Sequence, residues 1–560
     1  MVQIMFSMLR RRHPVMVLAC LLLLGCPAAA LAQQPQTVKD VNNVRDLTLD
    51  SLEKVRQARI APGKSRRGDH PVLFLIGNST MRNGTLGNGN NGQWGWGYFA
   101  EDYFDKTKIS VENQALGGTS SRTFYRRLWP EVRQALRPGD WVIISIGHND
   151  NGPLDKGRAR ASLIGTGEDS LLVNVQEIHG NDTTYRPEMV YTYGGYLRHF
   201  VREVRQAGAH PILMSLTPKK YRTADGSHLR GDEHKYGQWA ATIAREMNVP
   251  FVDLNAISTK KLESYSRWKC DYHFYGDNIH TSAFGARLNA RSAAEGLIAC
   301  EHPEVLPLKA MMMPLTTPTV DVQRHPGRPV VFITGDSTVK NNDKDDDGMW
   351  GWGAFAQQVL DTKKVTPVNC AKAGRSLRSY LNEGRWDKVC NSIQPGDYVL
   401  IPFGHNDLGN PAGAKARNEI NAVEDTCHVY KMEGSGRYEL VYSFGWYLRK
   451  YIDDVRERGG KPVIVSLTPR NIWKDGKIER RNDTYGQMYR AVAAETATPF
   501  IDLHNIAADR LDKMGQKKAT ACFNHDHTHM SKAGASAVAK DVAKAFKKLL
   551  KEEAKTIKNN

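Results

Sequence analysis

The chain carries one ordered set of short motifs twice, and this internal repeat constrains its fold more than any other feature. The set opens with Gly77-Asn78-Ser79-Thr80 in the first half and with Gly335-Asp336-Ser337-Thr338 in the second. Each opening motif leads through a polar loop into a Trp-Gly-Trp-Gly sequence. The two serines lie 258 residues apart (337 − 79), whereas solenoid repeats have periods of about 20 to 50 residues. The repeat therefore predicts two copies of one globular domain.

Four further motifs recur in the same order in both halves. They are Pro138-Gly139-Asp140 with Pro395-Gly396-Asp397, Gly147-His148-Asn149-Asp150 with Gly404-His405-Asn406-Asp407, Leu216-Thr217-Pro218 with Leu467-Thr468-Pro469, and Asp-x-x-His at Asp277 and Asp526. A chain of 560 residues also exceeds what one core normally holds. We divide it into a signal peptide at 1–32, an N-terminal lead-in at 33–69, a first domain at 70–303, a linker at 304–327, a second domain at 328–551 and a basic tail at 552–560.

Within each half, short apolar runs alternate with stretches of helical periodicity. This alternation is typical of βαβ units and predicts an α/β fold with a mostly parallel sheet. The predicted strands are Val72–Ile76, Trp141–Ile146, Pro211–Leu216, Pro250–Leu254 and Val330–Ile333. The predicted helices of the first half are Arg122–Ala135, Tyr191–Gln206 and Lys235–Glu246.

The N-terminus has the pattern of an export signal. Arg10-Arg11-Arg12 precede an apolar run from Val15 to Leu24, and Ala30-Leu31-Ala32 follows as a cleavage site. The protein is therefore expected to be secreted or periplasmic. As an alternative, Leu23-Leu24-Gly25-Cys26 resembles a lipobox, which would leave a lipid anchor at Cys26 on the outer membrane. No other stretch is long and apolar enough to predict a transmembrane span.

The formal net charge of +17 suits an acidic ligand such as a polyuronate. Nucleic acid is a poorer candidate, because the chain has no basic helix and no nucleic-acid-binding signature. Dispersed lysines that serve solubility explain the charge equally well. Six cysteines remain after cleavage at residue 32, and their pairing is not readable from sequence.

Each half places a serine after its first strand, an asparagine after a middle strand and an Asp-x-x-His motif near its end. A serine hydroxyl needs an adjacent base to act as a nucleophile, and that base needs an orienting carboxylate. An aspartate three residues before a histidine can reach its Nδ1 within one turn. Backbone N–H groups and an asparagine amide can stabilise the oxyanion. The candidates are Ser79, Gly118, Asn149, Asp277 and His280 in the first half, and Ser337, Gly374, Asn406, Asp526 and His529 in the second.

The second half resembles the four sequence blocks of the SGNH (GDSL-type) hydrolases. It contains, in this order, Gly-Asp-Ser-Thr, Ala-Gly-Arg-Ser, Gly-His-Asn-Asp and Asp-x-x-His. Trp-Gly-Trp-Gly, the run Arg375 to Tyr380 and Asp526-His527-Thr528-His529 look like the rhamnogalacturonan acetylesterase branch. The resemblance implies two tandem three-layer α/β/α domains of flavodoxin-like type. It also implies no metal and no cofactor. It implies two catalytic triads, which are Ser79 with Asp277 and His280, and Ser337 with Asp526 and His529. It also implies that the oxyanion holes contain Gly118 and Asn149 in the first half, and Gly374 and Asn406 in the second.

The first half departs from this pattern in three places. Asn78 replaces an aspartate, Gly117-Gly118-Thr119 replaces Ala-Gly-Arg, and Asn278-Ile279 replaces His-Thr. None of these changes removes a triad or oxyanion residue. We therefore expect both halves to be active, with a first site that is slower or differs in substrate.

Six further residues are predicted to bind substrate. Arg375 and Arg378 could hold a uronate carboxylate beside the site. Trp96 and Trp352 either stack on sugars or pack in the core. His148 and His405 either contact substrate or only pack. The cluster His525, Asp526, His527 and His529 could instead suggest a metal, but the first half lacks two matching histidines.

The resemblance implies an enzyme that removes acetyl groups from rhamnogalacturonan, an acetylated acidic polysaccharide of pectin. Another ester, in acetylxylan or a lysophospholipid, is the alternative within the same chemistry. A carbohydrate-binding protein with one silent half is the alternative from a different class.

Overall fold

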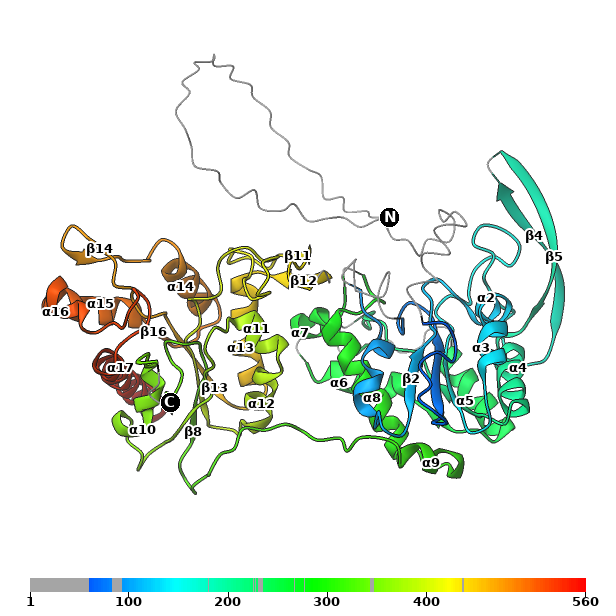
Figure 1. The fold of residues 1–560 in the computed structure, drawn as a ribbon, viewed down its shortest axis with the longest axis horizontal. Helices are drawn as coiled ribbons and strands as arrows, with labels where there is room; N and C mark the ends of the chain where they lie inside the picture. Colours follow the sequence, from blue (N-terminus) through cyan, green and yellow to red (C-terminus); the bar gives the residue numbers. More distant parts are fainter. Residues whose placement is uncertain are drawn as a thin grey trace, which may run out of the picture. The chain divides into compact units, whose positions relative to one another are not determined.

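The computed structural model describes residues 60–82, 93–179, 181–224, 226, 228–229, 235–265, 267–275, 277–342, 347–435 and 438–559 (Figure 1). The predicted signal peptide, Cys26 and most of the lead-in lie outside these residues, so export and lipidation stay predictions. No helix among the described residues is long and apolar enough to cross a membrane. The six cysteines from Cys270 to Cys522 are free thiols.

The first half is built on a five-stranded sheet in which every neighbouring pair is parallel. Its spatial order is β2-β1-β3-β6-β7. The strands are β1 (Val72–Gly77), β2 (Ser110–Asn113), β3 (Trp141–Ser145), β6 (His210–Met214) and β7 (Phe251–Val252). The sequence predicted four of these strands and missed β2, which is only partly apolar.

The second half repeats this sheet with the equivalent order β9-β8-β10-β13-β16, again all parallel. The strands are β8 (Val330–Ile333), β9 (Thr366–Asn369), β10 (Tyr398–Ile401), β13 (Lys461–Val465) and β16 (Phe500–Ile501). The α/β fold and its duplication are therefore confirmed.

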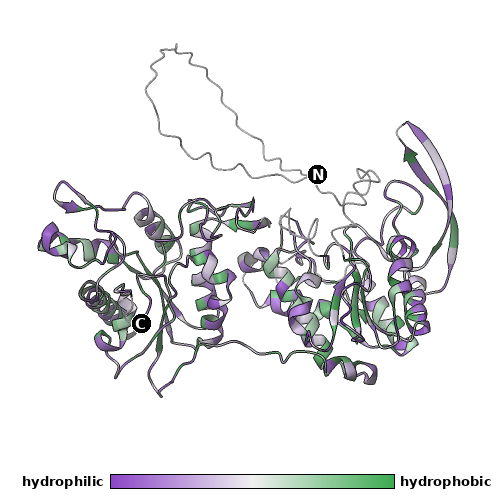
Figure 2. Ribbon diagram, viewed as in Figure 1, coloured by the Kyte–Doolittle hydropathy of each residue, from purple (hydrophilic) through white to green (hydrophobic). Residues whose placement is uncertain are grey.

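Both sheets lie between two layers of helices, so their strands are buried on both faces. In β1, Val72, Phe74 and Ile76 enter one core, and Leu73 and Leu75 enter the other. The central strands are mostly green in Figure 2. One face of the first sheet is covered by α2 (Ser121–Arg127), α3 (Trp129–Ala135), α4 (Tyr193–Gln206) and α5 (Tyr236–Met247), and the other by η2 (Trp96–Tyr98), η3 (Ala100–Tyr103), α6 (Leu254–Glu263) and α8 (Ala283–Ala299).

The second sheet is covered in the same way. One layer contains α11 (Leu377–Asn382), α12 (Arg385–Ser392), α13 (Phe444–Arg456) and α14 (Tyr485–Glu495). The other contains η5 (Trp352–Phe355), α10 (Ala356–Val359), α15 (Leu503–Met514), α16 (Gln516–Thr520) and α17 (Lys532–Asn559).

Three local features differ from the predictions. The helix expected over Arg122–Ala135 is divided into α2 and α3 at Leu128, and Pro130 lies in the first turn of the second segment. The predicted linker is partly packed, since Val305 and Leu308 belong to a core of the first half. Each half also has an unpredicted antiparallel hairpin, β4 (Ser170–His179) with β5 (Asp182–Tyr191) and β11 (Cys427–Lys431) with β12 (Tyr438–Tyr442).

A buried aspartate ties the segment before each sheet to its central strand. Asp397 accepts hydrogen bonds from the backbone of Val330 at 2.7 Å and of Gln394 at 2.8 Å, and it pairs with both Nη atoms of Arg324 at 3.2 and 2.7 Å. In the first half Asp140 and Arg66 form the same pair at 2.8 and 2.7 Å. The lead-in and the linker thus each supply one arginine that anchors the domain that follows.

We expect Arg324→Ala to destabilise the second half by about 3 kcal/mol, because Asp397 would stay buried without its cation. Calorimetry should show the corresponding transition lowered by roughly 6 to 12 °C. Arg328→Ala is the control, since Arg328 is exposed and its side chain donates an exposed hydrogen bond to the Thr362 carbonyl. If both variants unfolded at the same temperature, the anchor would not be stabilising.

Candidate active sites

Each candidate nucleophile lies in a turn directly after the first strand of its half. Ser337 follows β8, and the turn is closed by hydrogen bonds from the backbone of Val339 and Lys340 to the Asp336 carbonyl. Gly335 has a φ of +129°, a backbone conformation that L side chains rarely adopt, and a Cβ there would come within 2.8 Å of Val339. Ser337 is therefore held at the carboxyl edge of a parallel sheet, where ligands bind in such folds.

In the first half, Ser79, His280 and Asp277 form a continuous hydrogen-bonded row. His280 Nε2 lies 2.8 Å from Ser79 Oγ, and His280 Nδ1 lies 2.5 Å from Asp277 Oδ2. The other carboxylate oxygen of Asp277 accepts the backbone N–H groups of Ile279 and His280 at 2.8 and 2.7 Å. The carboxylate thus orients both the ring and its backbone.

The second half repeats this row with nearly the same distances. His529 Nε2 lies 2.8 Å from Ser337 Oγ, and His529 Nδ1 lies 2.6 Å from Asp526 Oδ2. Burial alone would raise the pKa of the Asp526 carboxyl, but hydrogen bonds from the His529 amide and ring lower that pKa to about 2. Asp526 therefore stays charged and can stabilise an imidazolium beside it.

The candidate oxyanion residues meet at a neighbouring loop in each half. Asn149 donates one amide hydrogen to the Thr119 carbonyl at 2.9 Å, and Asn406 donates one to the Arg375 carbonyl at 3.1 Å. The preceding glycines, Gly118 and Gly374, have φ values of +78° and +76°. Each asparagine therefore has a second N–H on the same nitrogen that can bind an oxyanion.

The aspartate-to-asparagine change at the first site leaves the local turn intact. Asn78 Oδ1 accepts the N–H and the hydroxyl of Thr80 at 3.1 and 3.0 Å. Asp336 Oδ1 makes the same two contacts with Thr338, both at 2.8 Å. The substitution removes a buried carboxyl whose pKa is raised by burial, but it preserves the hydrogen bonds that shape the nucleophile turn.

The two tryptophans predicted as sugar platforms are core residues, so this prediction is corrected. Trp96 is 1% exposed and Trp352 is 2% exposed, and both pack in the hydrophobic layer beside their sheet. His148 and His405 bind the hydroxyls of Thr217 and Thr468 through Nε2, at 3.1 and 3.0 Å. A substrate contact for either histidine stays a prediction.

The prediction that Arg378 binds substrate is wrong, because its side chain is 0% exposed. Arg378 pairs with Glu439 of β12 at 2.8 Å and donates to the carbonyls of Pro411 and Asn418 at 2.9 and 2.6 Å. Arg375 is partly exposed, but its Nε already pairs with Glu383 at 3.0 Å. The positive charge of Arg375 is therefore already partly neutralised by Glu383, and this makes a substrate carboxylate less needed there.

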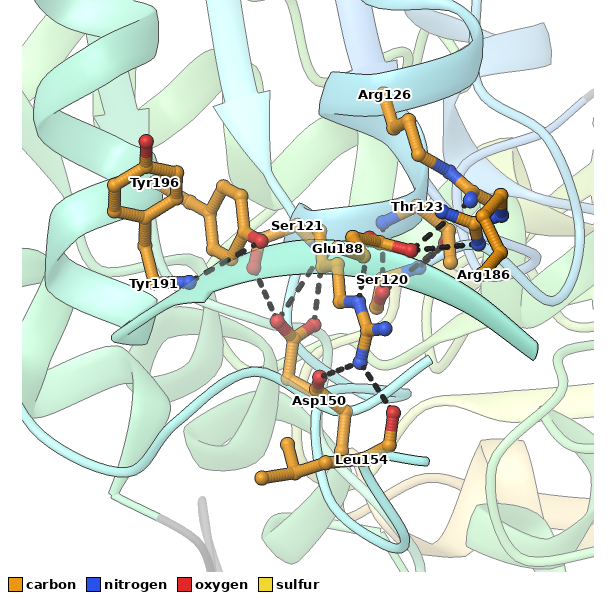
Figure 3. Close-up of polar contacts among 12 residues, drawn as sticks. Ser120, Ser121, Thr123, Arg126, Asp150, Leu154, Arg186, Glu188, Tyr191 and Tyr196 are labelled. Carbon is orange, nitrogen blue, oxygen red and sulfur yellow. Dashed lines mark hydrogen bonds and ion pairs between the residues drawn. The ribbon is translucent and has the colours of Figure 1, made fainter. Parts of the chain in front are cut away.

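Arg122 has the same structural role in the first half, where its partner Glu188 lies beside Arg126 and Arg186 (Figure 3). It pairs with Glu188 of β5 at 2.8 Å and donates to the carbonyls of Leu154 and Ala161 at 2.9 and 3.0 Å. Glu188 also binds Arg126 and Arg186. The hairpin and the loop after Asn149 are thus joined through one buried guanidinium.

The residue after each oxyanion asparagine is a buried acid, and its partners differ between the halves. Asp150 accepts hydrogen bonds from the backbone and hydroxyl of Ser121, while burial raises its pKa to about 6. Asp407 lies beside Glu419, and burial raises the pKa of both carboxyls. Two buried carboxylates side by side would also repel each other, so one of the two keeps a proton, which we assign to Glu419 because its pKa is raised well above the usual value.

Sequence reasoning missed one pair of arginines near the oxyanion loops. Arg160 donates to the Gly118 carbonyl at 3.1 Å, and Arg417 donates to the Gly374 carbonyl at 3.3 Å. Each lies 11 residues after its oxyanion asparagine (160 − 149 and 417 − 406). This equal spacing is the signal that could have identified them.

Comparison with known proteins identifies the family of this chain. The sequence model of the GDSL-like Lipase/Acylhydrolase family matches residues 75–288 and 333–537, which include both rows. A rhamnogalacturonan acetylesterase of Emericella nidulans is 30% identical over 38% of this chain and 83% of its own length. Rhamnogalacturonan acetylesterase RhgT of Bacillus subtilis is 31% identical over 39% and 90%. Among solved structures, the acetylxylan esterase Axe2 of Geobacillus stearothermophilus is 22% identical, with a TM-score of 0.27, over 40% of this chain and 93% of that one.

The proton that Glu419 keeps beside Asp407 predicts a pH effect on the stability of the second half. Folding raises the pKa of Glu419, so the folded state keeps a proton that the unfolded state releases above about pH 4. Stability should therefore fall as the pH rises from 5 to 7, by about 2 kcal/mol for one proton. Glu419→Gln should remove most of this dependence.

Calorimetry at pH 5 and pH 7 measures this effect. Glu424→Gln serves as the control, because Glu424 is an exposed acid on the same segment. An unchanged pH dependence in Glu419→Gln would show that the two buried carboxyls do not share a proton.

Proposed function

Because the chain belongs to the GDSL-like Lipase/Acylhydrolase family, we propose that its two halves are serine esterases that remove acetyl groups from an acidic polysaccharide. The observation that carries this proposal is the Ser-His-Asp row, which occurs twice with Oγ to Nε2 distances of 2.8 Å. Both rows have a nucleophile, a base within hydrogen-bond reach and a carboxylate that orients the base.

The proposed reaction is an acyl transfer through an acyl-enzyme. Ser337 Oγ attacks the ester carbonyl while His529 Nε2 accepts the hydroxyl proton, and Asp526 stabilises the imidazolium. The oxyanion binds the N–H groups of Ser337 and Gly374 and the second amide hydrogen of Asn406. His529 then returns the proton to the leaving sugar oxygen, and water releases acetate by the same steps.

The first half supports the same chemistry with its own residues. Ser79 is the nucleophile, His280 the base and Asp277 the orienting carboxylate, while Gly118 and Asn149 provide oxyanion donors. Asn78 makes the same turn contacts as Asp336, so the substitution leaves the nucleophile in place. We therefore propose two active sites rather than one active and one silent half.

The substrate we propose is the acetylated pectic polysaccharide rhamnogalacturonan. Two relatives that are 30% and 31% identical are rhamnogalacturonan acetylesterases, and the net charge of +17 suits a polyuronate. The predicted export signal at residues 1–32 supports the same proposal, because a polysaccharide of this kind is met by an exported enzyme.

The number of active sites can be measured with a chromogenic acetate ester. Ser79→Ala and Ser337→Ala should each keep the activity of the other half, and the double variant should lose about a thousandfold or more. Ser264→Ala, an exposed serine, is the control. If one single variant were as inactive as the double variant, the other half would be silent.

The oxyanion assignment predicts a loss in turnover rather than in binding. In a Ser79→Ala background, Asn406→Ala should lower kcat by about 100- to 1,000-fold with a small change in KM. In a Ser337→Ala background, Asn149→Ala should do the same. Wild-type kcat in either variant would exclude that asparagine from the oxyanion hole.

A further inference from the structure

We propose that Arg160 and Arg417 are the carboxylate-binding residues of the two active sites, each holding the carboxylate of the uronic acid residue that carries or adjoins the acetyl ester. This inference rests on the proposed esterase function and replaces the predicted roles of Arg375 and Arg378. It commits both sites to an anionic substrate.

The first argument is position. Arg160 and Arg417 contact the carbonyl oxygens of Gly118 and Gly374 at 3.1 and 3.3 Å, and the N–H groups of these glycines are the proposed oxyanion donors. At Gly374, a Cβ built on the backbone would have Arg417 Nη1 as its nearest described neighbour, at 3.7 Å. The guanidinium therefore borders open space beside the reacting ester.

The second argument is charge. Among the described residues, neither Arg160 nor Arg417 forms an ion pair, whereas Arg122, Arg375 and Arg378 all do. Burial and the nearby Arg158 lower the pKa of Arg160 to about 10, although the buried Asp150 acts in the opposite direction. A substrate carboxylate would offset this unfavourable environment.

The third argument is donor capacity. A guanidinium has five N–H donors, and the glycine carbonyl is bound through Nη1 alone. The remaining donors suffice for a bidentate carboxylate contact, which is the geometry in which arginine binds carboxylates best.

The fourth argument is that both loops are shaped to present the arginine. The preceding residues, Ala159 and Ala416, have φ values of +40° and +46°, a conformation that costs roughly 1 kcal/mol or more for a residue other than glycine. Each alanine also closes a turn, to Lys156 at 3.1 Å and to Gly413 at 2.8 Å.

The buried arginines, Arg122 and Arg378, donate hydrogen bonds to backbone carbonyls of these loops. Arg122 binds the carbonyls of Leu154 and Ala161, which flank Arg160 in sequence. Arg378 binds Pro411 and Asn418 in the same way around Arg417. The same strained presentation in both halves favours a function for the partly exposed guanidinium beyond packing.

A purely structural role would be to fix the glycine carbonyl, and it would affect every ester equally. The test therefore compares an acetylated methyl galactosiduronate with its methyl ester, in which a neutral methoxycarbonyl group replaces the carboxylate, and it measures the release of acetate. Arg417→Gln is measured in a Ser79→Ala background and Arg160→Gln in a Ser337→Ala background.

We expect kcat/KM for the free uronate to fall about 10- to 100-fold, mainly through KM, because a charged hydrogen-bonded contact is lost. The methyl ester should change less than about threefold. Lys156→Gln and Lys415→Gln remove the same charge from exposed positions of the same loops and should leave the preference for the uronate unchanged.

The inference is overturned if both substrates lose activity equally, or if the lysine controls reduce the preference for the uronate as much as the arginine variants do. A parent enzyme that hydrolyses neither compound nor a chromogenic acetate ester would instead refute the proposed function. Circular dichroism and the thermal midpoint establish that each variant is folded.

Discussion

The ion pair between a buried arginine and a hairpin glutamate is the interaction on which the architecture of each site depends. Arg378 and Glu439 lie 2.8 Å apart, and Arg122 and Glu188 lie at the same distance. A guanidinium with no exposed surface is stable only when its donors are bound. The loop carbonyls and the glutamate supply those acceptors, so the hairpin, the loop after the oxyanion asparagine and the first helix after the oxyanion glycine are held as one unit.

The two halves stabilise the next layer of polar groups differently. In the first half Asp150 is satisfied by the backbone and hydroxyl of Ser121. In the second half the backbone N–H of Leu377 donates to Asp407, and the Glu419 carboxyl lies beside Asp407 where the first half has a serine hydroxyl. A serine donor leaves the acid ionisable, whereas a second carboxyl keeps one proton buried. The duplicated domains thus share the outer geometry of the site but differ in the electrostatics behind it.

The sequence was sufficient for the triads and insufficient for the arginines, for a physical reason. Asp526 and His529 are three residues apart, and Ser337 ends an apolar strand, so local rules place all three. The burial of Arg378 depends on Glu439, 61 residues away, on a hairpin whose strands lack a clear apolar alternation. Trp96 and Trp352 were ambiguous because burial is decided by tertiary packing. The sequence predicted a mostly parallel sheet but not the order of its strands. It also missed β2, because the residues of this strand are largely polar.

The distribution of arginines therefore carries more information than the net charge. Arg122 and Arg378 have their charge neutralised inside the fold, and Arg375 is paired on the surface. Arg160 and Arg417 form no ion pair among the described residues, although each is partly buried beside an oxyanion loop. An unpaired cation at such a site is unfavourable in the free protein, and its presence in both halves is best explained by an anionic group that binds there during turnover.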